Sequence, residues 1–161
     1  MDRVAIIRCG SMEVALAKAV ALAHPTLLVV DIEPGVIAWN SDAGVRKREI
    51  LRVNAQLKHA GHEVWFVSNG SFKLDDIQSD VRVTTRAHKP WTSMRRLPSG
   101  SAELPRVVIG DQVWTDGLLA CRLGATFMLI DLPREGVPLW PRWQRRLSWT
   151  PRVIFREVVG D

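Results

Sequence analysis

The stretch LLVVDIEPGV, residues 27–36, decides the fold class. Its first four residues are all apolar and lack the alternation of a half-exposed strand. Such a continuous run is typical of a strand that is covered on both faces, as in a parallel sheet between helices. The strand is predicted to end at Asp31, the first of several carboxylates that follow predicted strands.

Other strands and helices alternate with this one along the chain. Short apolar runs predict four more strands, at residues 63–67, 81–84, 106–109 and 125–130. Apolar residues at helical spacing predict three helices, at residues 12–24, 42–60 and 115–123. Ser11 and Gly61 are typical capping residues at the start of the first helix and the end of the second. This alternation predicts an α/β fold with a doubly wound parallel sheet.

Length and composition indicate one soluble domain. The chain has 161 residues, 47% hydrophobic and 24% charged, which excludes general disorder. Two cysteines are too few for a disulfide framework, so we expect a reducing, cytoplasmic location. Apolar runs are too short for a membrane-spanning helix, and the first eleven residues lack the pattern of a signal peptide.

Basic residues are concentrated in two blocks. The net charge is +5; residues 82–106 alone sum to +5 and residues 134–161 to +3, which favours an anionic partner. We therefore expect a core domain at 1–133 and a basic C-terminal extension at 134–161.

The segment WPRWQRRLSW, residues 140–149 of that extension, mixes indoles with arginines. We favour packing on the domain for this segment. Peripheral contact with an anionic membrane is the second interpretation, and single-stranded nucleic acid the least favoured.

Chemically useful side chains follow the predicted strands. They are Asp31 and Glu33, Ser68 and Asn69, Lys89, Asp111, and Asp116. Ligands of open α/β sheets bind at the carboxyl ends of the strands. Close carboxylates need a cation, an all-oxygen set favours Mg²⁺, and a lysine beside the metal suits a phosphoryl group. The sequence has no GxxxxGK[ST] loop, which argues against a nucleoside triphosphate held in a P-loop.

In order and context, these motifs resemble the haloacid dehalogenase (HAD) superfamily. They are LLVVDIEPGV at 27–36, VWFVSNG at 64–70, HKP at 88–90 and VVIGDQVWTD at 107–116. The fourth, with RLG at 122–124, is similar to the YqeG-type subfamily IIIA phosphatases, a group that includes enzymes acting on phosphatidylglycerophosphate. The resemblance implies a Rossmannoid sheet in which the five predicted strands take the order 3-2-1-4-5. Short intervals between the motifs leave little room for a cap.

The resemblance also implies a role for each motif residue. Asp31 would be the nucleophile that forms an aspartyl-phosphate. Asp31, the main-chain carbonyl of Glu33 and Asp111 would hold Mg²⁺, so Asp31 and Asp111 must lie within about 6 Å of each other. Ser68 and the backbone N–H of Asn69 would hold phosphoryl oxygens. Lys89 would offset negative charge, and Asp116 would orient Lys89 or a metal-bound water.

The first motif departs from the family pattern at two positions. Glu33 stands where the family has its general acid/base aspartate, and Gly35, preceded by Pro34, stands where it has Thr or Val. Two functions therefore remain open. One is a Mg²⁺-dependent phosphomonoester hydrolase acting on a phosphorylated small molecule or a lipid headgroup. The other is a non-catalytic HAD-like binding module with a degenerate first motif.

Overall fold

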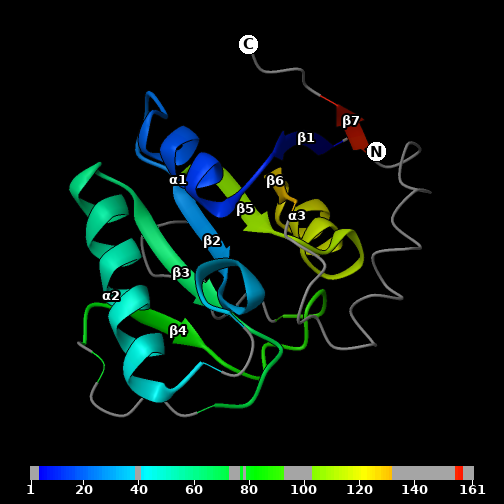
Figure 1. Ribbon diagram of the computed structural model, residues 1–161. Coiled ribbons are helices and arrows are strands. Elements are labelled where there is room, and N and C mark those ends of the chain that lie inside the picture. The colour runs from blue at the N-terminus through cyan, green and yellow to red at the C-terminus, as the bar shows by residue number, and fades with distance from the viewer. Residues whose placement is uncertain are drawn as a thin grey trace.

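A computed structural model describes residues 4–38, 41–72, 77, 79–92, 103–131 and 155–157. Its strands form one sheet in which every neighbouring pair is parallel, in the order β4-β3-β2-β5-β6-β1-β7 (Figure 1). The strands are β1 (Val4–Cys9), β2 (Leu27–Asp31), β3 (Glu63–Val67), β4 (Arg82–Thr84), β5 (Arg106–Gly110), β6 (Thr126–Ile130) and β7 (Phe155–Glu157). The α/β class and the Rossmann-like parallel sheet are confirmed.

Two strands at one side of the sheet were not predicted. The five predicted strands correspond to β4, β3, β2, β5 and β6, and β1 and β7 extend the sheet beyond β6. The order of five strands expected from the resemblance is therefore not that of the complete sheet. The apolar part of β1 is interrupted by Arg8, and the strand is held in the sheet by parallel pairing with β6 and β7.

The predicted C-terminal extension is described only at residues 155–157. There β7 pairs with β1, with Val4 opposite Phe155. The Trp/Arg segment 140–149 lies outside the described residues, so the interpretations offered for it stay predictions.

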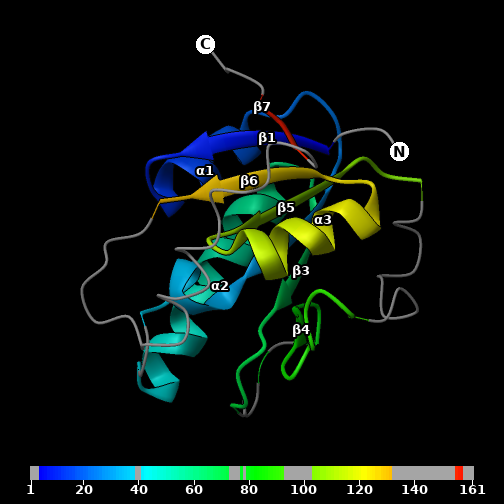
Figure 2. The same ribbon diagram turned by 90° about the vertical axis from the view of Figure 1, so that its right-hand side faces the viewer.

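Helices cover both faces of the sheet. Figures 1 and 2 show α1 (Met12–Val20) and α2 (Ala43–His59) on one face and α3 (Leu118–Leu123) on the other. Ser11 caps α1 as predicted, and Asp42 caps α2 by accepting a 2.8 Å hydrogen bond from the Val45 N–H. Helix α1 ends four residues earlier than predicted, because the chain turns at Ala21 toward β2.

Alternate residues of β2 serve two separate apolar cores. Leu28 and Val30 pack with the buried faces of α1 and α2, whereas Leu27 and Val29 pack with α3. Each of these four side chains has no exposed surface. Burial on both faces explains why the sequence of this strand is continuously apolar.

Two wide turns follow the central strands. The turn η1 (Ile32–Val36) follows β2 and carries Glu33, and η3 (Val113–Gly117) follows β5 and carries Asp116. The helix predicted at 115–123 is thus divided. The N–H groups of Asp116 and Gly117 both donate to the Gln112 carbonyl, and the regular helix α3 starts only at Leu118.

Across the described part of the chain, none of the helices has the length and apolar character needed to span a membrane.

Candidate functional site

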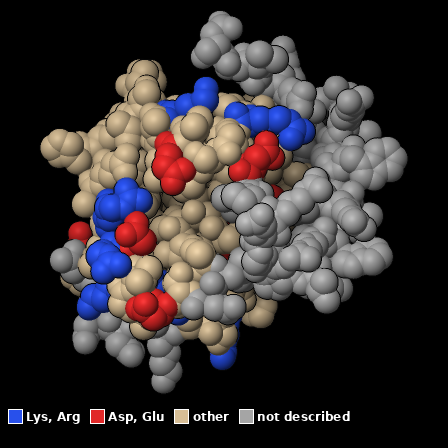
Figure 3. Space-filling view, viewed as in Figure 1, with Lys and Arg blue, Asp and Glu red and all other residues tan. Residues whose placement is uncertain are grey.

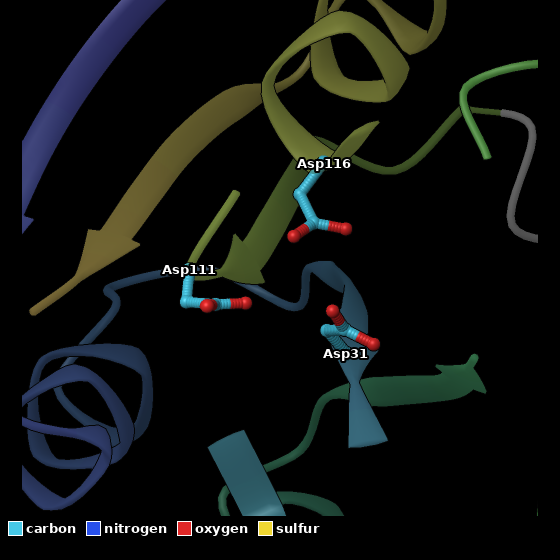
Figure 4. A group of neighbouring side chains, drawn as sticks. All are labelled: Asp31, Asp111 and Asp116. Atoms are coloured by element: carbon cyan, nitrogen blue, oxygen red, sulfur yellow. The ribbon is translucent and has the colours of Figure 1, made fainter. Parts of the chain in front are cut away.

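Three buried carboxylates converge at the carboxyl ends of β2 and β5. Asp31 is the last residue of β2, Asp111 directly follows β5, and Asp116 lies in η3. One oxygen of each lies within 4.8 Å of the others, and Figure 4 shows all three side chains pointing into the same space. The separation of Asp31 and Asp111 therefore meets the limit of about 6 Å set by a shared metal ion.

Lys89 joins two of these carboxylates. Its Nζ lies 2.7 Å from an oxygen of Asp31 and 2.7 Å from an oxygen of Asp116. Only 2% of the Lys89 side chain is exposed, so this ammonium is a buried counter-charge rather than a solvated surface group. The predicted proximity of Lys89 to Asp31 and Asp116 is thus present in the structure.

Asp116 is fixed by its own turn as well as by Lys89. Its second carboxylate oxygen accepts a 3.2 Å hydrogen bond from the Gln112 N–H. The same carboxylate covers the α-carbon of Gly110, where a Cβ atom would collide with it. Gly110 is therefore required by the close approach of Asp116 to the end of β5.

The site is electronegative despite the lysine. Three carboxylates and one ammonium leave a formal charge of −2 when all are ionised. Burial raises the pKa of Asp31 well above its usual range, the neighbouring Asp116 acts in the same direction, and Lys89 opposes them. The two carboxylates outweigh burial for Lys89 and raise its pKa, which keeps it protonated. A bound cation would relieve the remaining repulsion.

The loop after β3 positions the segment that carries Lys89. The Asn69 side chain accepts a 2.7 Å hydrogen bond from the Lys89 N–H, and the Ser68 hydroxyl accepts a 2.9 Å bond from the Gly70 N–H. The Ser68 carbonyl accepts from the Ala87 N–H at 2.9 Å. Ser68 and Asn69 were predicted to bind phosphoryl oxygens; that role stays a prediction, and the structure adds that the Asn69 side chain fixes the loop of Lys89.

The Glu33 carboxylate pairs with Arg46 of α2 and is not part of the close group formed by the three aspartates. Its Oε1 lies 3.4 Å from a terminal nitrogen of Arg46. Burial raises the pKa of Glu33, while the nearby Arg46 opposes that effect. The pair is mostly shielded from water, with 13% of the Arg46 side chain and 8% of the Glu33 side chain exposed.

Arg46 is a part of this site that the sequence did not reveal. The run GVRKR at residues 44–48 has the composition of a solvated helix start, but only 13% of the Arg46 side chain is exposed. Its guanidinium stacks on the Phe72 ring at 4.3 Å and donates to the Ser41 carbonyl at 3.0 Å. No local pattern distinguishes it from the adjacent basic residues, because its contacts come from other segments.

Several of the other basic side chains of α2 pair with acidic side chains at the surface. Arg52 pairs with Glu49 at 2.8 Å, and Lys58 pairs with Glu63 at 3.0 Å. On the face shown in Figure 3, basic and acidic side chains lie beside one another over this region. This part of the described surface therefore lacks the uninterrupted basic area expected of a nucleic-acid interface.

Comparisons of the chain with protein-family models, with curated proteins and with solved structures found no match.

Proposed function

We propose that the chain is a Mg²⁺-dependent phosphomonoester hydrolase of HAD type, with Asp31 as its nucleophile. The observation that carries the proposal is the convergence of Asp31, Asp111 and Asp116 around Lys89 at one edge of a parallel sheet. The motif resemblance supports it independently.

The donor set fits a hard divalent cation. Asp31 and Asp111, with the main-chain carbonyl of Glu33, would hold Mg²⁺, which prefers oxygen ligands. When bound, the ion would neutralise charge on the nucleophile and on the phosphoryl group. Lys89 brings a single positive charge to a cluster of three buried carboxylates, and a divalent cation held by their oxygens would reduce the repulsion between them.

The chain's own residues supply the rest of the chemistry. An oxygen of Asp31 attacks phosphorus and forms an aspartyl-phosphate, while the bond from phosphorus to the ester oxygen breaks and the Glu33 carboxyl gives that oxygen a proton. Glu33 then takes a proton from water as the water oxygen attacks phosphorus and releases Asp31. The net reaction converts ester and water into alcohol and inorganic phosphate.

The remaining residues hold the reactants. Lys89 stays protonated between Asp31 and Asp116 and stabilises negative charge on the nucleophile and the phosphoryl oxygens. Ser68 and the Asn69 N–H would bind phosphoryl oxygens. Because the intervals between motifs leave little room for a cap, the site would be open, which suits a large substrate such as a lipid phosphate at a membrane surface, or a phosphorylated small molecule if a partner closes the site.

Hydrolysis of an aryl phosphate with and without Mg²⁺, in wild type and Asp31→Asn, tests this function. The amide of Asp31→Asn has nearly the same shape but cannot attack phosphorus. We expect Mg²⁺-dependent turnover in wild type and, because the covalent route is lost, a fall of at least about 10³-fold in the variant. Circular dichroism should show an unchanged fold.

The non-catalytic binding module is the second candidate, and the Glu33–Arg46 ion pair favours it. A carboxylate engaged by arginine at 3.4 Å is less free to exchange protons than an unpaired one. This candidate predicts that Mg²⁺ stabilises the chain but that no aryl, sugar or lipid phosphate is hydrolysed. Mg²⁺-dependent turnover that Asp31→Asn abolishes would exclude it.

A further inference from the structure

We infer that Arg46 is a positioning residue for Glu33. It holds the longer glutamate side chain against the Ser68–Gly70 turn, which is the predicted phosphoryl-binding loop. This inference rests on the proposed function. The ion pair between Arg46 and Glu33 then explains how a glutamate can replace the shorter aspartate that the family pattern has at this position.

The Glu33 carboxylate lies between Arg46 and the Ser68–Gly70 turn. On one side its Oε1 lies 3.4 Å from Arg46. On the other side is the turn after β3, where a Cβ built on Gly70 would lie 2.8 Å from Glu33 Oε2 and 3.1 Å from the Ser68 hydroxyl. The absence of a side chain at Gly70 is therefore what admits the glutamate carboxylate to this place.

Arg46 is itself held in place by two contacts. Its guanidinium stacks on Phe72 at 4.3 Å, and it donates to the Ser41 carbonyl at 3.0 Å. A planar guanidinium fixed at its face and at its edge retains little rotational freedom. Arg48, two residues further along α2, has 71% of its side chain exposed and provides a matched control.

The chemical need for such a contact follows from side-chain length. Glutamate has one more rotatable bond than aspartate, so its carboxyl explores more positions. A general acid must come within about 2.6–3.2 Å of the leaving oxygen. Misplacement on the order of 1 Å can cost about 10²-fold in rate. A fixed arginine on the far side of the carboxylate limits that freedom.

The test compares leaving groups in Arg46→Met, with Arg48→Met as the control. The probes are 2,4-dinitrophenyl phosphate, whose leaving group needs no proton, and a simple alkyl phosphate, whose leaving group does. The quantity measured is kcat/KM, which reports the steps up to formation of the aspartyl-phosphate.

We expect Arg46→Met to lower kcat/KM about 10²-fold for the alkyl ester and less than about threefold for the dinitrophenyl ester, since only the former depends on an acid. Arg48→Met should change neither. In a Glu33→Gln background, Arg46→Met should add almost nothing, because the group that it positions is gone. A crystal structure of Arg46→Met should show the Glu33 carboxylate displaced from the Ser68–Gly70 turn.

Other results would overturn the inference. Equal losses for both esters would assign Arg46 a general structural role. A raised KM with unchanged kcat for both esters would make it a substrate-binding residue. An unmoved Glu33 carboxylate in the variant would also contradict positioning. If wild type hydrolyses neither ester with Mg²⁺, the proposed function itself fails and the inference falls with it.

Discussion

At the scale of single residues, Lys89 is the buried counter-charge of Asp31 and Asp116. Its ammonium contacts Asp31 and Asp116 at 2.7 Å each and is almost fully buried. Removal of one partner from a buried ion pair leaves an uncompensated charge, which costs far more than the loss of a surface pair. The same buried charge should make stability depend on a divalent cation.

We predict that Lys89→Met lowers the free energy of unfolding by about 3–5 kcal/mol in EDTA. Added Mg²⁺ should recover more stability in this variant than in wild type, because the ion compensates carboxylates that Lys89 no longer neutralises. Urea denaturation with EDTA and with Mg²⁺ measures both effects. The control is Lys58→Met, whose pair with Glu63 is partly exposed, so its loss should stay within about 1 kcal/mol. Similar losses in both variants would contradict a buried counter-charge.

The element that shapes the site is the corner between β5 and η3. The Gln112 carbonyl receives two N–H donors, from Asp116 and Gly117, and the Gln112 N–H in turn binds the Asp116 carboxylate. This turn folds Asp116 back over Gly110. Regular helix from residue 115, as the sequence suggested, would not form this wide turn.

We predict that Gly110→Ala displaces the Asp116 carboxylate and weakens Mg²⁺ binding. The added Cβ collides with that carboxylate, and overpacking of this kind costs about 1–3 kcal/mol. Gly10→Ala is the matched control, because an added Cβ there meets no atom within 4 Å. Isothermal titration calorimetry gives the Mg²⁺ affinity of each variant. Unchanged affinity in Gly110→Ala would show that the position of Asp116 is irrelevant to the metal.

The sequence predicts the local features of the fold and the site, but not the contacts between segments that lie far apart in the chain. The apolar run of β2 and the acids that follow β2 and β5 are local features, so the central strands and the aspartate cluster were predictable. The strand β1 was missed, because its pairing with β6 and β7 is a contact between distant segments. For the same reason the sequence does not distinguish Arg46 from its basic neighbours: its contacts with Glu33, Ser41 and Phe72 exist only after folding.

At the scale of the whole molecule, the proposed active site lies at the centre of the sheet, whereas β7 contributes to stability at one edge of it. The aspartates follow β2 and β5, whereas β7 is separated from β5 by two strands, β6 and β1. Strand β7 contributes hydrogen bonds to β1 along a register from Val4 opposite Phe155 to Ile6 opposite Glu157. Loss of β7 should therefore lower the stability of the sheet and leave the proposed metal site intact.

We predict that a chain ending after residue 154 loses about 1–3 kcal/mol of unfolding free energy, the net contribution of a few ladder hydrogen bonds. The additional stability conferred by Mg²⁺ should equal that of the full chain, because no carboxylate of the cluster is touched. A chain that ends after Glu157 retains the pairing and is the control.

Urea denaturation of the three chains, with EDTA and with Mg²⁺, separates the two effects. The shorter chain should also self-associate in size-exclusion chromatography, because removal of β7 leaves the backbone groups of β1 unpaired at the sheet edge. Loss of Mg²⁺ stabilisation in the shorter chain alone would contradict this separation. It would mean that the chain of strand pairings from β1 through β6 to β5 transmits the effect of β7 to the aspartate cluster.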